Sequence, residues 1–217
     1  SRFNEVQIYL NYISSVEPKN PAEQPSMELK IQRGLFYVHL YAALEKSIND
    51  IIETTLILIA SKSVKGIHYS SGFSVVAFSN KLRSLKDSGY NNFFNKSIDI
   101  FEEARSTNVT PINEAVFAKS LQNVWAKTID EVYRSLGMKE FKLTAKERAT
   151  IDEIVEKRNA VAHGRESPSV AGERHRSDVL RQKYSVISEI SIRIIDDMET
   201  YYSNKSYLKP VAKKYYA

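Results

Sequence analysis

The stretch that most limits the possible folds of this chain runs from Met27 to about Ser61. It contains no proline and one glycine, Gly34, and its apolar residues recur at intervals of three and four, as on one face of a helix. The pattern predicts one long central helix, with Gly34 as the place where it could kink. The expected apolar stripe is Leu35, Val38, Ala42, Ile48, Ile52 and Leu56, and the expected polar positions are Tyr37, Tyr41, Glu45 and Asp50.

The rest of the chain repeats this periodicity in shorter segments. Seven glycines and six prolines in 217 residues are few, which favours helices over a turn-rich β-fold. Further helices are expected over residues 3–13, 73–85, 97–104, 119–136, 144–164 and 178–202. The sequence therefore predicts an all-α bundle in one domain, 1–217, in which residues 203–217 form a flexible basic tail.

Composition sets limits on function. The chain has 42% hydrophobic and 26% charged residues, as ordinary soluble proteins do, and its net charge of +5 permits an anionic partner without requiring one. It has no cysteine, which excludes disulfides and a thiol nucleophile and fits a reducing cytoplasm. Because no apolar run is long enough to span a bilayer and no secretion signal opens the chain, we expect a cytoplasmic protein without a membrane partner.

The stretch from Lys157 to Gly164 is the one place where chemistry is visible. Thr144 and Glu147 have the spacing of a capping box that begins a helix, and Gly164 is a plausible end. Arg158 continues the apolar stripe of this helix, so its guanidinium needs a partner.

Asn159 and His163 are four residues apart and share a face, so the amide could orient the imidazole or bind the same ligand. Arg158 and His163 are separated by about 140° around an ideal helix. Either the last turn is distorted or two chains contribute. Ala160 and Ala162 would let a second helix approach at this point.

Arg158, Asn159 and His163 resemble the signature of the HEPN superfamily, an Arg often followed by Asn, His or Asp, with a His after a short spacer. This combination arises by chance in about one chain of this length in a hundred. The resemblance is closest to stand-alone prokaryotic HEPN-like nucleases of defence and toxin systems. It implies a homodimeric helical bundle that cleaves RNA without metal or cofactor, leaving a cyclic phosphate and a free 5′-hydroxyl.

Under this resemblance each motif residue has a role. His163 would be the general base or acid, Arg158 would grip the scissile phosphate, and Asn159 would position one of them. Glu45 would pair with Arg158 or hold the imidazole, although it could also be simply solvated. No glycine-rich phosphate loop and no His-Glu-x-x-His sequence occurs, and four histidines offer few metal ligands, so no metal site is expected.

The segment from Gly164 to Ser177 is expected to be a flexible basic loop beside the site. Arg165, Arg174 and Arg176 would hold RNA phosphates there, and an ordinary exposed loop is the alternative. His175 is a weaker catalytic candidate because nothing in the sequence fixes its geometry.

Two alternatives concern partners. A non-catalytic helical module that binds RNA, a nucleotide or a protein would use the same residues as an interface cluster. A cognate antitoxin or regulatory protein is a further partner, but the tyrosine two positions after the His that some relatives carry is Arg165 here. That departure makes control by modification of such a tyrosine doubtful.

Overall fold

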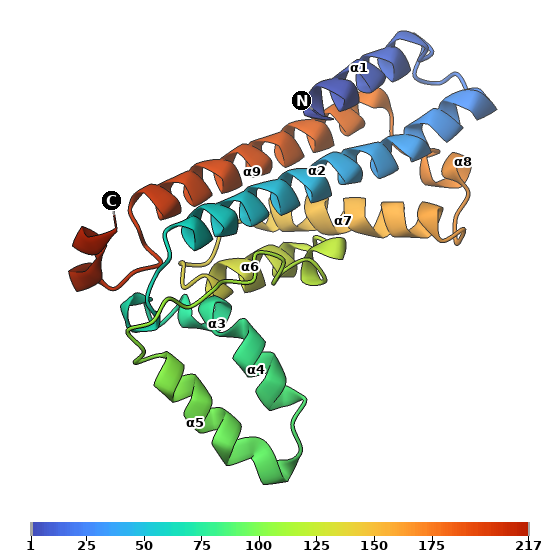
Figure 1. The fold of residues 1–217 in the computed structure, drawn as a ribbon. Helices are drawn as coiled ribbons and strands as arrows, with labels where there is room; N and C mark the ends of the chain where they lie inside the picture. The colour runs from blue at the N-terminus through green and yellow to red at the C-terminus, as the bar shows by residue number, and fades with distance from the viewer. Residues whose placement is uncertain (1, 217) are drawn as a thin grey trace. The chain divides into compact units, whose positions relative to one another are not determined.

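The computed structural model describes residues 2–216, and this part of the chain is helical, with two isolated β-bridges and no strand (Figure 1). The predicted all-α class is therefore confirmed. The chain divides into two compact units. The first comprises the chain up to Ile48, Gln122–Ala126 and Lys142–Ile194, and the second comprises Asn49–Leu121, Lys127–Phe141 and the chain from Ile195 on. The predictions of a single domain and of a homodimer stay predictions.

The first unit is a bundle of helices that includes the motif. Its helices are α1 (Arg2–Ser15), α2 (Met27–Ser61) up to Ile48, α7 (Ala145–Ala162), α8 (Pro168–Ala171) and α9 (Ser177–Ser203) up to Ile194. The Tyr9 hydroxyl on α1 donates to the Gln32 carbonyl on α2 at 2.9 Å. On α9, Lys183 pairs with Glu153 of α7 at 2.5 Å. These contacts place the helices side by side (Figure 1).

Helix α2 has the predicted length, and its predicted buried face is confirmed in part, because Ile48, Ile52 and Leu56 are buried. In the part of α2 that belongs to the first unit, the buried side chains include Phe36, Tyr37, Leu40, Tyr41 and Leu44. Leu35 and Ala42, which were expected there, are exposed. The buried face turns toward the two tyrosines because each hydroxyl finds a partner inside the unit, which removes the cost of burying it.

Both ends of α7 follow the sequence prediction. Thr144 Oγ1 accepts a hydrogen bond from the Glu147 backbone at 3.2 Å, and Glu147 Oε2 accepts one from the Thr144 backbone at 2.7 Å. Gly164 has a φ of +68°, the left-handed conformation that ends a helix and that other residues adopt with strain. His163 is therefore fixed as the last residue before the chain turns.

The second unit is built around aromatic side chains. Its helices are α2 from Asn49, α3 (Ser74–Ala77), α4 (Ser79–Lys86), α5 (Phe93–Glu103), most of α6 (Ala126–Ser135) and the end of α9, with 3₁₀ turns η1 (Gly66–His68), η2 (Tyr90–Asn92), η3 (Ser120–Gln122) and η4 (Pro210–Tyr215). Tyr69, Phe73, Tyr201 and Tyr207 pack together with ring centroids 5.4–6.5 Å apart. The helix predicted over 73–85 is interrupted at Phe78, where α3 ends and α4 begins.

The helix predicted over residues 119–136 is shorter than expected and begins only at Ala126. Inside the first unit, the Val124 backbone N–H donates to the Tyr41 hydroxyl at 3.0 Å, and that of Ala126 donates to Asp152 Oδ1 at 3.0 Å. These donors would otherwise start or continue helical bonds. Side chains distant in sequence thus replace the first turns of the expected helix.

The basic tail also differs from the flexible segment that was expected. Tyr207, Leu208 and Ala212 are buried, and η4 forms within the tail. Three of its lysines also make contacts, because Lys205, Lys209 and Lys213 each donate to a backbone carbonyl. Burial of the apolar side chains stabilises this segment despite its positive charge. Within residues 2–216, no helix combines the length and the apolar run that a membrane crossing requires.

Candidate functional site

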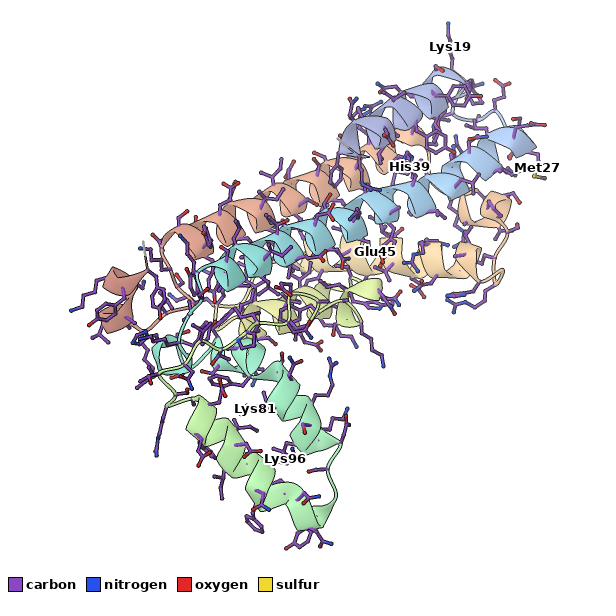
Figure 2. The ribbon with its side chains drawn as sticks, in the orientation of Figure 1. Lys19, Met27, His39, Glu45, Lys81 and Lys96 are labelled. Carbon is purple, nitrogen blue, oxygen red and sulfur yellow. The ribbon has the colours of Figure 1, made fainter. Side chains whose placement is uncertain are left out.

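Arg158 extends from α7 to α2, inside the first unit. Its Nη2 donates to Glu45 Oε2 at 3.2 Å and to the Gln122 carbonyl at 3.4 Å, and its Nη1 donates to Asn159 Oδ1 at 2.7 Å. Its Cζ lies 3.9 Å from the centroid of the Tyr41 ring. Figure 2 shows Glu45 on the side of α2 that faces α7. Three segments distant in sequence therefore hold one guanidinium.

The surroundings of Arg158 are partly desolvated. The Arg158 side chain is 18% exposed and that of Glu45 is 30% exposed. The Tyr41 hydroxyl donates to the Gln122 carbonyl at 3.2 Å and accepts from the Val124 backbone. Burial raises the pKa of Tyr41, so its hydroxyl remains a protonated structural group. The ion pair is therefore partly open to solvent.

His163 has a different environment. Its backbone N–H donates to the Asn159 carbonyl at 3.0 Å, which closes the last turn of α7. Its side chain is exposed, and nothing in residues 2–216 donates to or accepts from the ring. Within one chain Arg158 and His163 point in different directions. The angle of about 140° between them on an ideal helix predicted this separation. The Asn159 amide contacts Arg158 and not the imidazole.

The segment after the motif is not the flexible loop that was expected. It contains α8, whose first turn is capped by Ser167 and begins at Pro168. A Cβ added at Gly34 on α2 would lie 1.9 Å from the Pro168 carbonyl oxygen, and one at Gly172 would lie 2.0 Å from the Lys30 carbonyl oxygen. Glycine is therefore required at both positions for α8 to lie directly on α2. This contact anchors the chain that follows His163.

The three arginines proposed to bind phosphate differ in exposure and in the contacts of their side chains. Arg165 is exposed and lines a surface depression of about 300 Å³ with Lys157 and Glu166. Arg174 is exposed. Arg176 is engaged, because its Nη2 donates to the Pro18 carbonyl at 3.0 Å and lies 3.4 Å from Glu17 Oε2.

Glu17 is the centre of a buried cluster that fixes the start of α9. Its Oε1 accepts from Arg33 Nη2 at 2.7 Å and from the Ser177 backbone at 2.7 Å. The side chains of Arg33 and Glu17 are 2% and 7% exposed. A carboxylate at this helix N-terminus, paired with a buried arginine, explains why Arg176 has a structural partner.

His175 is held in place by residues that sequence reasoning missed. The hydroxyl of Tyr37 is hydrogen-bonded to His175 Nδ1, and Glu153 Oε1 lies 3.8 Å from the same nitrogen. Burial lowers the pKa of His175, and the Lys183 charge nearby lowers it further. A buried tyrosine needs a hydrogen-bond partner for its hydroxyl. Had the sequence placed Tyr37 in the core, a polar partner such as His175 would have been sought.

These features define the class of protein. An all-helical chain in which an Arg-Asn-x-x-x-His sequence ends a capped helix, with its arginine paired to an acidic residue of a long helix, fits the HEPN superfamily. The chain belongs to the RiboL-PSP-HEPN family, whose model matches residues 1–204. No curated protein and no solved structure matches it. Membership of this family points to a nuclease-like or RNA-related function.

Proposed function

We propose that this protein is a metal-independent endoribonuclease whose site is assembled from two copies of the chain. The observation that carries the proposal is the guanidinium of Arg158, which forms a partly exposed ion pair with Glu45 near the end of the helix that also presents His163. RNA cleavage without metal needs a cation that can bind the phosphate and an imidazole that can transfer a proton.

The reaction would be a transesterification within the RNA. A general base removes the proton of the 2′-hydroxyl, the 2′-oxygen bonds to phosphorus, and the bond from phosphorus to the 5′-oxygen breaks. A general acid protonates that leaving oxygen, which gives a cyclic phosphate and a free 5′-hydroxyl. His163 is the group for proton transfer, because imidazole titrates near neutral pH. Arg158 would stabilise the negative charge that develops on the phosphorane.

The geometry of α7 supports a second chain. Arg158 and His163 are directed apart on α7, so one chain offers one proton-transfer group at a distance from its own arginine. Two chains related by a two-fold axis would supply an imidazole for each proton transfer and two guanidinium groups. Glu45 and Asn159 act as positioning residues, because they hold Arg158 until a phosphate replaces the carboxylate.

Substrate contacts beyond the scissile phosphate are assigned by exposure. Arg165 and Arg174 are exposed and available to RNA phosphates. Arg176 is a weaker contact than the sequence suggested, since Glu17 and the Pro18 carbonyl engage it. The biological setting we propose is defence or growth arrest, with an antitoxin or regulatory protein as a further partner.

The test is cleavage of end-labelled total tRNA and of a structured single-stranded RNA in EDTA. We expect the wild type to cleave and both Arg158→Ala and His163→Ala to fail. His39→Ala is the matched control, since its ring packs beside Tyr9 away from the motif and should retain activity. Full cleavage by either motif variant would refute the assignment of the site.

A non-catalytic module that binds RNA, a nucleotide or a protein is the second candidate. The number of groups that engage Arg158 favours it, because a guanidinium with four neighbours can be purely structural. In that case both folded motif variants and the wild type would leave RNA intact. Arg158→Ala would then lower the melting temperature and His163→Ala would weaken only binding.

A further inference from the structure

The hairpin formed by α4 and α5 in the second unit has no buried side chain in either helix. The two helices lie side by side (Figure 1), and Lys81 joins them by pairing with Glu103 at 3.1 Å and donating to the Asp99 carbonyl at 3.2 Å. Figure 2 shows Lys81 and Lys96 on this hairpin. Short helices that bury no side chain are only marginally stable in water. We therefore expect the apolar surface of this hairpin to be buried against another molecule.

The exposed apolar surface lies on one face of α5. Phe94, Ile98 and Phe101 follow one another at helical spacing and are 65%, 54% and 67% exposed, and Tyr90, just before the helix, is 83% exposed. We call these four residues the α5 seam. At about 150–250 Å² for a fully covered aromatic side chain, the seam offers roughly 500 Å² of apolar surface per chain. That is near the upper end of the largest patch on a typical monomer.

The charge of the hairpin argues against RNA as the molecule that binds the α5 seam. Residues 79–103 contain four basic side chains, Lys81, Arg83, Lys86 and Lys96, and four acidic ones, Asp87, Asp99, Glu102 and Glu103. Affinity for a nucleic acid depends on an excess of positive charge that displaces counterions. A neutral hairpin with an apolar seam is suited to a protein surface instead.

We propose that the α5 seam is a contact between two copies of this chain, in which the two α5 helices lie antiparallel across a two-fold axis near Ile98. Two seams together supply roughly 1,000 Å², and the flanking residues would bring the total to the 1,200 Å² or so at which stable interfaces begin. An isologous contact uses the same patch twice, so one apolar seam is sufficient.

The arrangement of charges supports the antiparallel direction. At or near the tip of the hairpin, Lys86 and Lys96 outnumber the one acidic residue, Asp87, whereas Asp99 and Glu102 lie toward the C-terminal end of α5. Antiparallel helices bring the acidic end of each α5 toward the basic tip of the second copy, and Phe94 toward Phe101 of that copy. Parallel helices would place like charges together.

This inference does not depend on nuclease activity. A chain that associates through the seam and leaves RNA intact would keep the inference and refute the nuclease. A chain that cleaves RNA with an intact site and associates through another surface would do the reverse. The two failures are therefore distinguishable.

The first experiment measures association by analytical ultracentrifugation at micromolar concentration. We expect the wild type to be a dimer and the double variant Phe94→Asp, Phe101→Asp to associate at least about thirtyfold more weakly, as charges in the centre of an apolar interface do. Ile192→Asp is the matched control, because Ile192 is 54% exposed, as is Ile98, and lies on α9. Circular dichroism establishes that each variant is folded.

The second experiment uses the lack of native cysteine. Ile98→Cys should form a disulfide-linked dimer under mild oxidation, and Ile192→Cys should not. Reversing Asp99 and Glu102 to lysine should weaken the dimer, and adding Lys86→Glu and Lys96→Glu should restore it. A monomeric wild type, or a dimer unaffected by the Phe94 and Phe101 changes, overturns the proposal. A monomeric wild type whose binding of single-stranded RNA is lost in the Phe94 and Phe101 variant would overturn it in favour of RNA.

Discussion

Arg158 and His163 are five residues apart in α7 and at its C-terminal cap, and their surroundings differ. Four groups from α2, α7 and residues 122–126 surround the guanidinium, whereas the imidazole is exposed at the end of α7. The arginine is therefore organised by the folding of its own chain. Under the proposed function, the histidine would gain its partner from the substrate or from a second copy.

This difference separates stability from activity. Removing an exposed side chain costs little folding free energy, whereas removing one that fills a polar cluster leaves its neighbours unsatisfied. Variants at the two positions should consequently lose the same reaction with different effects on stability.

The largest effect is expected from His163→Ala. Loss of a proton-transfer group should lower the cleavage rate by about 10²–10⁴-fold. The free energy of unfolding should change by less than about 0.5 kcal/mol, because the ring is exposed. Cleavage of end-labelled RNA and urea denaturation measure the two quantities. A large loss of stability would contradict the contrast between the two residues.

Arg158→Ala should lower both quantities. Loss of charge stabilisation on the phosphorane should reduce cleavage by about 10²–10³-fold. Stability should fall by about 1–2 kcal/mol, since Glu45 and the Gln122 carbonyl lose a donor while remaining partly solvated.

A double-mutant cycle with Glu45→Gln isolates the ion pair within that loss. Arg158→Lys serves as the matched control, because it keeps the charge and loses the planar set of donors. Unchanged stability in Arg158→Ala would mean that the observed contacts contribute nothing to folding.

A smaller effect on cleavage is expected from Tyr41→Phe. The ring beneath Arg158 remains, so activity should fall by less than about tenfold, while the buried Val124 N–H loses its acceptor at a cost of about 1–3 kcal/mol. Thermal unfolding and single-turnover cleavage test this division. An activity loss as large as that of Arg158→Ala would assign the hydroxyl a direct part in the reaction.

The smallest effect is a pH dependence at His175. Burial and the nearby Lys183 lower its pKa in the folded protein, although the Glu153 charge opposes this. The unfolded chain then binds the proton more readily, so the full stability is present above about pH 6.5 and is lost as pH falls through the folded pKa. His175→Gln should flatten unfolding midpoints between about pH 7 and pH 5.

Local signals in the sequence predicted the fold well where they act over a few residues. The cap at Thr144, the end at Gly164 and the length of α2 depend on neighbouring residues, and each was predicted. The buried face predicted for α2 is confirmed at Ile48, Ile52 and Leu56 and wrong in the part that precedes them, because Tyr37 and Tyr41 are buried rather than polar positions. Their hydroxyls are satisfied by His175 and by Gln122, 138 and 81 residues away, which no local pattern reveals.

The candidate site shows the same limit. The need of Arg158 for a partner followed from its place on an apolar stripe, and Glu45 was one of the partners considered. The stacking on Tyr41 and the support of His175 by Tyr37 depend on how distant segments of the first unit pack. The roles of these residues in catalysis stay a proposal.

The backbone contact between α8 and α2 affects how random mutagenesis of this protein should be interpreted. Any side chain at Gly34 or Gly172 would lift α8 from α2 and release the segment that follows His163. A selection for inactive clones would therefore recover both glycines beside the motif residues. Such clones would be inactive because the segment after His163 is no longer held against α2. They should be excluded from any map of the RNA-binding surface.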